Sequence, residues 1–207
     1  MSVAMAKRSY FNDPSCGDQS ANWEIEEKSI LCIVDGLGHG PDAETAAKAA
    51  VAYVGDHLSD SLSEIFKGCD AALRSTRGAV MGIAVIDENA KTLTYAGIGN
   101  TEIRIIGRKG GGLASDRGIV GGGYRSLNPQ TLPLADGQTV LMFTDGIDRG
   151  IDISGYDASL VSNLPDLAKK IIEDWGQETD DRAVLIYRSG GCQGLRGTSE
   201  RPGVNDE

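Results

Sequence analysis

The chain has 207 residues, of which 40% are hydrophobic, a length and composition that predict one domain with a real core. Its formal net charge is -10 and its pI is near 4.7, and no cluster of Lys and Arg appears, so nucleic acid is excluded as a partner. No apolar segment has the length of a membrane span or of a signal-peptide core, which excludes a membrane association. The four cysteines share no zinc-type spacing and demand no disulfide framework, so we expect a cytoplasmic protein.

The first third of the chain predicts three strands and then two helices. The strands are expected at residues 3–10, 23–27 and 30–34. The first helix should begin at Pro41, because alanines and valines then recur at helical spacing as far as Val54. The second is expected over residues 62–73, where Ser61 and Glu64 have the spacing of a capping box.

Alternating hydrophobicity returns in the middle of the chain. Residues 80–86 and 92–95 predict a hairpin, and residues 103–106 a further strand. Glycine then dominates residues 107–123, which favours a mobile loop. Within it, residues 117–123 are interpreted either as a flap beside a site or as a plain surface loop.

The last third predicts a strand, a helical region and a closing strand. The strands are expected at residues 139–144 and 182–187, and the helical spacing over residues 160–172 should break near Asn163 because Pro165 follows. We therefore expect one domain over residues 1–188 and a disordered tail over residues 189–207. This order of elements favours an α+β sandwich over a doubly wound sheet.

Four acidic motifs stand out along the chain. Each places a carboxylate beside a glycine or a second acid; they are Gly17-Asp18, the stretch from Asp35 to Gly40, Thr144-Asp145-Gly146 and Asp180-Asp181. Taken singly, each is also what an ordinary turn contains. Asp35 and Asp145, however, directly follow apolar strand-like runs, and strand ends can aim acids at one point.

Carboxylates gathered at one point repel one another unless a cation lies among them. Asp18, Asp35, Asp145 and Asp180 therefore predict a site for Mg²⁺ or Mn²⁺, which prefer oxygen ligands. Two such ions could share Asp35, take the carbonyl of Gly36 as a further ligand and activate a water molecule for in-line hydrolysis of a phosphate ester. His39, near these acids, either protonates the leaving alcohol or packs the loop, whereas His57 suits the end of the first helix.

The motifs together resemble the metal-dependent type 2C (PPM) serine/threonine protein phosphatases, in the bacterial branch that contains SpoIIE and the Rsb phosphatases. The resemblance covers about residues 3–188 and is carried by residues 35–40, 143–147 and 180–184. It implies a four-layer αββα sandwich of two mainly antiparallel sheets flanked by helices, with two Mn²⁺ or Mg²⁺ ions between the sheets. It also implies that the substrates are phosphorylated STAS-domain proteins of the stressosome, whose dephosphorylation resets general-stress signalling.

The resemblance also implies a role for each site residue. Asp35 would bridge both cations, Asp18 and the Gly36 carbonyl would bind one, and Asp145 with Asp180 would bind the other. Asp181 would support the ligands without binding a cation itself.

The sequence departs from the wider family in three places. No arginine stands near Cys16, so phosphate binding would fall to the metals alone or to Arg117, Arg125 or Arg149. His39 follows Asp35 by four residues where the eukaryotic pattern has two, which leaves the general acid open. Asn100 replaces an aspartate that could serve a third metal, so a third metal is not expected.

Two other interpretations remain open from the sequence. A phosphatase of a single-domain anti-anti-sigma factor would share every site residue. A catalytically silent partner-binding module would keep the sandwich without the chemistry, although it would have no reason to retain four mutually repelling acids. The oligomeric state is not predicted.

Overall fold

The structure is a computed structural model that describes residues 3–108 and 112–190. Its elements, in chain order, are β1 (Val3–Arg8), the helical turn η1 (Tyr10–Asn12), β2 (Asp18–Ile25), β3 (Lys28–Gly36), α1 (Pro41–Asp56), α2 (Leu62–Ala72), the turn η2 (Leu73–Ser75), β4 (Ala79–Asp87), β5 (Thr92–Ile98), β6 (Glu102–Ile105), β7 (Gly112–Leu113), β8 (Gly118–Ile119), β9 (Gly123–Tyr124), β10 (Gln130–Pro133), β11 (Thr139–Phe143), α3 (Ala158–Ser162), α4 (Leu164–Trp175) and β12 (Arg182–Arg188).

The strands form two five-stranded sheets and a small hairpin. One sheet has the order β1-β12-β11-β6-β7 and the other β10-β5-β4-β3-β2, and every pairing within them is antiparallel. Strands β8 and β9 pair only with each other. The site described below depends on both large sheets, because it draws residues from each.

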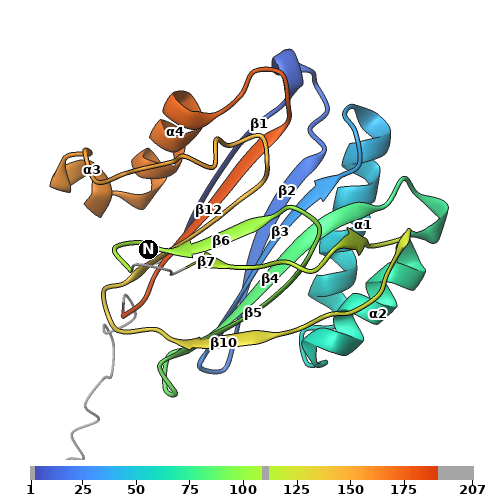
Figure 1. The fold of residues 1–207 in the computed structure, drawn as a ribbon, viewed down its shortest axis with the longest axis horizontal. Helices are drawn as coiled ribbons and strands as arrows, with labels where there is room; N and C mark the ends of the chain where they lie inside the picture. The colour runs from blue at the N-terminus through green and yellow to red at the C-terminus, as the bar shows by residue number, and fades with distance from the viewer. Residues whose placement is uncertain (1–2, 109–111, 191–207) are drawn as a thin grey trace, which may run out of the picture.

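The two sheets stack face to face, and helices cover their outer faces (Figure 1). Strand β3 shows why: Ile30, Cys32 and Val34 pack against α1 and α2, while Leu31 and Ile33 between them pack against the other sheet. A third apolar cluster lies between the sheet that contains β1, β12 and β11 and the helices α3 and α4. Three cores separate four layers, so the predicted αββα sandwich is confirmed.

The predicted helix signals are confirmed in detail. Pro41 is the first residue of α1, whose alanine stripe is fully buried against the sheet. Ser61 and Glu64 form the capping box at the start of α2, with the Glu64 amide donating to the Ser61 hydroxyl at 3.3 Å and the Ser61 amide to the Glu64 carboxylate at 3.0 Å. The helical region near the C-terminus breaks at Asn163, where α3 ends and α4 begins.

The glycine-rich segment is more ordered than the sequence predicted. In its described part, β8 and β9 form a hairpin, and the amide and carbonyl of Val120 exchange hydrogen bonds with Ala79 of β4 at 2.8 and 2.9 Å. Asp70 of α2 accepts hydrogen bonds from the amides of Gly121 and Gly123 at 2.8 and 3.2 Å. Backbone pairing to two neighbouring elements gives this segment a structure that its composition does not reveal.

Two further expectations concern regions that are only partly described. Most of the tail predicted after residue 188 lies outside the described residues. Within the part of the chain that the structure does describe, none of the helices has the length and apolar character needed to cross a membrane.

Candidate metal centre

Asp18 and Asp35 lie directly opposite each other on neighbouring strands. Asp18 is the first residue of β2, and it pairs in register with Asp35 near the end of β3. The Asp18 side chain is buried with 1% of its surface exposed, while Asp35 is only half-buried. Two carboxylates at adjacent cross-strand positions repel each other when both are charged. Their placement therefore needs a compensating interaction.

Thr144 and Asp145 reach the same place from the other sheet. They follow β11 directly, and the Thr144 hydroxyl donates to Oδ2 of Asp18 at 2.5 Å. The same hydroxyl oxygen accepts the backbone amide of Ala183 at 2.9 Å. One threonine thus ties β2 of one sheet to β11 and β12 of the other at the end where the acids gather.

Asp180 and Asp181 lie on the loop that leads into β12, and their side chains have different surroundings. Asp181 is buried, and its two carboxylate oxygens accept the amides of Tyr10 and Gly17, each at 2.8 Å. It therefore holds the segment that carries Asp18. Asp180 instead lines the cavity described below together with Asp35 and Asp145. Asp181 therefore contacts backbone amides, whereas Asp180 faces the cavity.

The pKa values of three of these acids are raised, because burial and the neighbouring carboxylates both disfavour the charged form. Burial, followed by the charges of Asp145 and Asp180, raises the pKa of Asp35 to about 8. Burial and then Asp35 raise the pKa of Asp18 well above its usual range, and burial and then Asp145 raise the pKa of Asp180. Each carboxylate thus disfavours the charged form of its neighbour, as expected of acids that a cation would neutralise.

The donor set fits a hard divalent cation. Oδ1 of Asp18 is buried and has no hydrogen-bond partner, which leaves one carboxylate oxygen available as a ligand. The acids that face one another offer only oxygen, as Mg²⁺ and Mn²⁺ prefer. In the described residues, however, no three Asp, Glu, His or Cys side chains are grouped closely enough to hold a metal ion. A shared cation would require these aspartates to turn toward a common point.

Glycine follows both Asp35 and Asp145 for a packing reason. A Cβ on Gly36 would lie 2.0 Å from the carbonyl oxygen of Ala43 in α1, and one on Gly146 would lie 2.0 Å from the carbonyl oxygen of Asp181. The sequence predicts a different part for Gly36, as the source of a carbonyl ligand for a cation. The close packing of these glycines fixes α1 and the 180–181 loop against the ends of β3 and β11.

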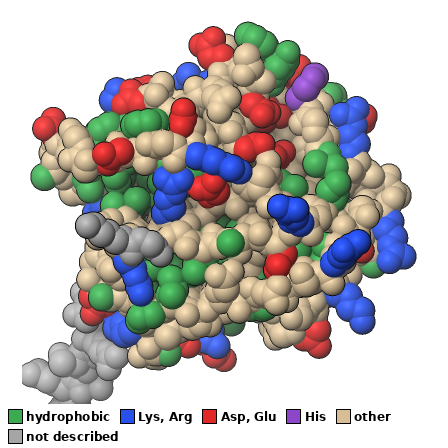
Figure 2. Space-filling view, in the orientation of Figure 1, with side chains coloured by type: hydrophobic (Ala, Val, Ile, Leu, Met, Phe, Trp, Pro, Cys, Tyr) green, Lys and Arg blue, Asp and Glu red, His purple; other side chains and the backbone are tan. Residues whose placement is uncertain are grey.

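A cavity of about 430 Å³ opens beside the acids. It is lined by Asp35, Leu37, Gly38, His39, Val80, Gly99, Asn100, Arg117, Gly118, Asp145 and Asp180. Asp18 and Gly36 are buried and are not part of this lining. Figure 2 shows acidic side chains gathered in the upper part of the visible face, over the end of β3. The cavity therefore brings together residues from both sheets and from the β8–β9 hairpin.

The structure separates the three candidate phosphate-binding arginines. Arg117 lines the cavity, whereas Arg125 is exposed and is not part of the lining. Arg149 pairs with Glu102, with its Nε 2.8 Å from the Glu102 carboxylate. Of these three arginines, Arg117 is the one that lines the cavity.

The two histidines also differ. His39 is exposed at the cavity, and its ring stacks on that of Tyr10 with the centroids 4.5 Å apart and the planes 9° apart. His57 caps the C-terminal end of α1, where its Nδ1 lies 2.8 Å from the Tyr53 carbonyl oxygen. His39 therefore packs against Tyr10 and also lies at the cavity.

Sequence reasoning missed three contributors to the site. Thr144 was visible only as part of a motif, and its bond to Asp18 depends on the contact between sheets. Asn100 donates to Asp145 Oδ2 at 2.5 Å, and its own Oδ1 is buried without a hydrogen-bond partner. Tyr10 supports His39 from a segment that looked like the end of a strand. Each of these contacts joins residues far apart in the sequence, so no local pattern could reveal it.

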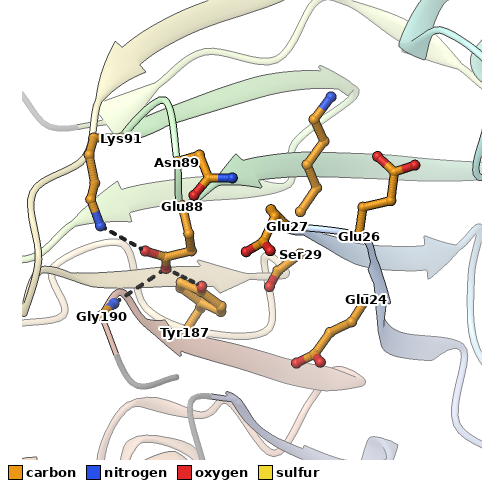
Figure 3. A pocket seen from close by; sticks show the side chains of 10 residues that line it. Glu24, Glu26, Glu27, Ser29, Glu88, Asn89, Lys91, Tyr187 and Gly190 are labelled. Carbon is orange, nitrogen blue, oxygen red and sulfur yellow. Dashed lines mark hydrogen bonds and ion pairs between the residues drawn. The ribbon is translucent and has the colours of Figure 1, made fainter. Parts of the chain in front are cut away.

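A second acidic cavity lies at the opposite end of the β2–β3 hairpin. One of its acids, Glu88, has a structural role. Its volume is about 190 Å³, and its lining includes Glu24, Glu27 and Glu88 (Figure 3). Glu88 follows β4 and accepts hydrogen bonds from the Tyr187 hydroxyl of β12 and from the amide of Gly190, and Lys91 pairs with it at 3.4 Å. This carboxylate therefore links the two sheets through donors of the chain itself.

Comparison with known proteins decides the family. The family model described as stage II sporulation protein E (SpoIIE) matches residues 26–189, which is most of the chain. The chain belongs to the SpoIIE family. Within this family, it is 30% identical over 178 residues to the phosphoserine phosphatase RsbX of Bacillus subtilis strain 168, a match that covers 83% of this chain and 80% of RsbX. The type 2C resemblance drawn from the acidic motifs is confirmed.

Solved structures of SpoIIE-family and related phosphatases share the fold. A chain solved in work on the bacterial stressosome, described as a modular system adapted to control secondary messenger signalling, superposes with a TM-score of 0.81 at 29% identity, covering 90% of this chain and 98% of that one. RsbX in complex with magnesium superposes with a TM-score of 0.73 at 20% identity, covering 90% and 94%. The phosphatase domain of SpoIIE from Bacillus subtilis gives the same TM-score and identity and covers 90% of this chain and 62% of that one.

Proposed function

We propose that this SpoIIE-family chain is a metal-dependent phosphoserine/phosphothreonine protein phosphatase that acts on STAS-domain proteins of the stressosome and so resets general-stress signalling. The observation that carries the proposal is the meeting of Asp18, Asp35, Asp145 and Asp180, contributed by both sheets, beside one open cavity. The relatives support it: RsbX is named a phosphoserine phosphatase, and one solved neighbour belongs to work on the stressosome.

Two Mg²⁺ or Mn²⁺ ions would be held by these aspartates and by the carbonyl of Gly36, with Asp35 between them. When bound, such ions supply positive charge that favours ionisation of water and stabilises charge on a transferring phosphoryl group. Asp18 would be held in place by Thr144, and Asp145 by Asn100. The Thr144 bond engages Oδ2 of Asp18 and leaves its Oδ1 for a cation, toward which the aspartates would still have to turn.

The remaining site residues would act on the substrate. Arg117, at the cavity, would pair with the phosphate, and Arg125, exposed outside the lining, would contact the substrate further from it. His39 would donate a proton to the leaving serine or threonine oxygen, with its ring held by the stack on Tyr10. A phosphorylated side chain of the substrate would enter this cavity of about 430 Å³.

We also place this activity in the cytoplasm. Cys16, Cys32 and Cys69 are buried free thiols. Burial raises the pKa of Cys16 and Cys69 to about 12, which leaves these thiols unreactive. Free thiols suit a reducing compartment.

The proposal is tested by phosphate release from 4-nitrophenyl phosphate in the presence of Mn²⁺. Asp35→Asn and Asp145→Asn should each abolish turnover, because each removes a proposed ligand charge while preserving side-chain size. Asp60→Asn, an exposed acid next to α2, is the matched control and should retain turnover. Unchanged turnover in both site variants would exclude the proposed centre.

The substrate is tested by incubating the protein with phosphorylated STAS proteins, with and without a chelator, and measuring intact mass. Loss of the phosphoryl mass only without chelator is expected for stressosome proteins. Faster loss from a single-domain anti-anti-sigma factor would identify that alternative substrate. A wild-type protein that binds these partners but removes no phosphate would be a partner-binding module.

A further inference from the structure

An aromatic side chain projects into solvent close to the candidate metal centre. Among the described residues, Phe11 and Met5 are the large hydrophobic residues that are exposed, with 59% and 43% of their surfaces accessible. Phe11 belongs to η1, the short blue turn at the top of Figure 1, and Figure 2 shows hydrophobic side chains at this end of the molecule beside a histidine. An exposed phenylalanine loses the free energy that its burial would contribute, so its position calls for a reason.

The backbone holds Phe11 in a conformation that bulky residues rarely adopt. Its φ is +39° and its ψ is +32°, in the left-handed region that favours glycine. Surrounding hydrogen bonds enforce this turn: the Tyr10 amide donates to Asp181 at 2.8 Å, and the Phe11 amide donates to the Glu178 carbonyl at 3.2 Å. The ring is therefore presented to solvent by a fixed turn.

The exposed ring is connected to the cavity by two ring contacts. Phe11 packs edge-on against Tyr10, with ring centroids 4.6 Å apart, and Tyr10 stacks on His39 at 4.5 Å. His39 in turn lines the cavity with Asp35, Asp145 and Asp180. We name Phe11, Tyr10 and His39 the aromatic ladder. Its outer end is Phe11 and its inner end meets the proposed phosphate-binding cavity.

We propose that Phe11 is a substrate-docking residue that contacts an apolar side chain of the substrate segment flanking the phosphoserine or phosphothreonine. This inference rests on the proposed phosphatase function. A substrate chain whose phosphorylated residue enters the cavity must pass over its edge, and the aromatic ladder leads outward from that edge, because His39 lines the cavity and Tyr10 and Phe11 continue away from it. An extended chain advances about 3.3–3.6 Å per residue, so the contact falls about two to four residues from the phosphorylated one.

The ladder also explains why this turn is tied to the catalytic centre. Asp181 binds the amide of Tyr10 with one oxygen and the amide of Gly17, next to Asp18, with the other. The same carboxylate thus positions the docking ring and the segment that carries a proposed metal ligand. A substrate held against Phe11 is held in a defined position relative to the acids, as efficient hydrolysis requires.

The test uses phosphoserine peptides with alanine at every other position and one leucine moved step by step along the sequence. The kcat/KM for phosphate release by the wild-type protein should be about three- to tenfold higher when leucine stands at one position on one side of the phosphoserine. Phe11→Asn, whose new side chain tolerates the left-handed turn, should remove this preference. Met5→Ala removes the other exposed large hydrophobic residue and should leave the preference intact.

Turnover of 4-nitrophenyl phosphate by each variant reports separately on the catalytic centre. A leucine preference that persists in Phe11→Asn overturns the docking role. A fall in kcat/KM that is equal for all peptides also overturns it. The same holds if Phe11→Asn changes only the oligomeric state, because Phe11 would then contact a second copy of the chain. A wild-type protein inactive on both kinds of substrate would instead refute the phosphatase function, and the docking role with it.

Discussion

The Thr144 hydroxyl donates a hydrogen bond of 2.5 Å to the buried carboxylate of Asp18, and the strands that carry the two residues belong to different sheets. Asp18 begins β2, whereas Thr144 follows β11, so this hydrogen bond helps to join the two sheets at the candidate metal centre. It also stabilises the charged form of Asp18, since a hydrogen bond from Thr144 lowers a pKa that burial raises. One hydroxyl group therefore contributes both to the link between the sheets and to the charge state of a proposed ligand.

Thr144→Val should weaken metal binding without unfolding the protein. The variant keeps the side-chain shape but removes the donor to Asp18 and the acceptor for the Ala183 amide. We expect the Mn²⁺ concentration for half-maximal turnover to rise about 10- to 100-fold and the free energy of unfolding to fall by about 1–3 kcal/mol. Thr144→Ser retains the hydroxyl and should behave like the wild type. An unchanged Mn²⁺ requirement in Thr144→Val would contradict the positioning role.

The chelated protein should become less stable as the pH rises. The pKa of Asp35 is about 8 in the folded chain and about 3.9 in an unfolded chain, so the folded state binds the proton more tightly. The stability that this proton contributes is complete below pH of about 4 and is lost as the pH rises toward about 8. Chemical denaturation in the presence of chelator, measured across this range, should show the fall.

Asp35→Asn provides the check on this pH dependence. The amide cannot ionise, so the chelated variant should lose less stability than the wild type between these pH values. Adding Mn²⁺ should flatten the wild-type profile, because a bound cation compensates the charged carboxylates. Parallel profiles for the chelated wild type and variant would show that Asp35 does not carry the effect.

Gly36→Ala should be strongly destabilising. The new methyl group would lie 2.0 Å from the Ala43 carbonyl oxygen, so β3 and α1 would have to move apart. We expect a loss of about 2–3 kcal/mol or more in the free energy of unfolding, together with reduced turnover. Gly155→Ala is the matched control, because nothing lies within 4 Å of a methyl group there. Equal stability of the two variants in thermal denaturation would contradict the close contact.

Glu88→Ala should lower stability without affecting catalysis. Glu88 accepts hydrogen bonds from Tyr187 and Gly190, which hold the two sheets together at the end away from the acids. Removing this acceptor should cost about 1–2 kcal/mol of unfolding free energy, while turnover of 4-nitrophenyl phosphate stays at the wild-type value. Glu24→Ala changes an acid in the same cavity for which Figure 3 draws no interaction, and it should be nearly neutral. A change in turnover in Glu88→Ala would show that the two ends of the sandwich are coupled.

Local signals predicted most of the secondary structure because they depend on neighbours in the sequence. The capping box at Ser61, the start of α1 at Pro41 and the break at Asn163 all involve residues within one helical turn. The β8–β9 hairpin was missed because its order comes from Asp70 and Ala79, which lie about 40 to 50 residues earlier.

Three features could be read from the order of residues alone: the four acidic motifs, the strand ends that carry two of their aspartates and the family to which the chain belongs. Which acid lines the cavity and which one binds backbone amides became clear only from the folded chain, because Asp180 and Asp181 are neighbours in sequence but face different partners. Likewise, the roles of Thr144, Asn100 and Tyr10 follow from contacts across sheets and loops. Such contacts form between residues brought together by burial of the apolar cores, and no pattern of adjacent residues records them.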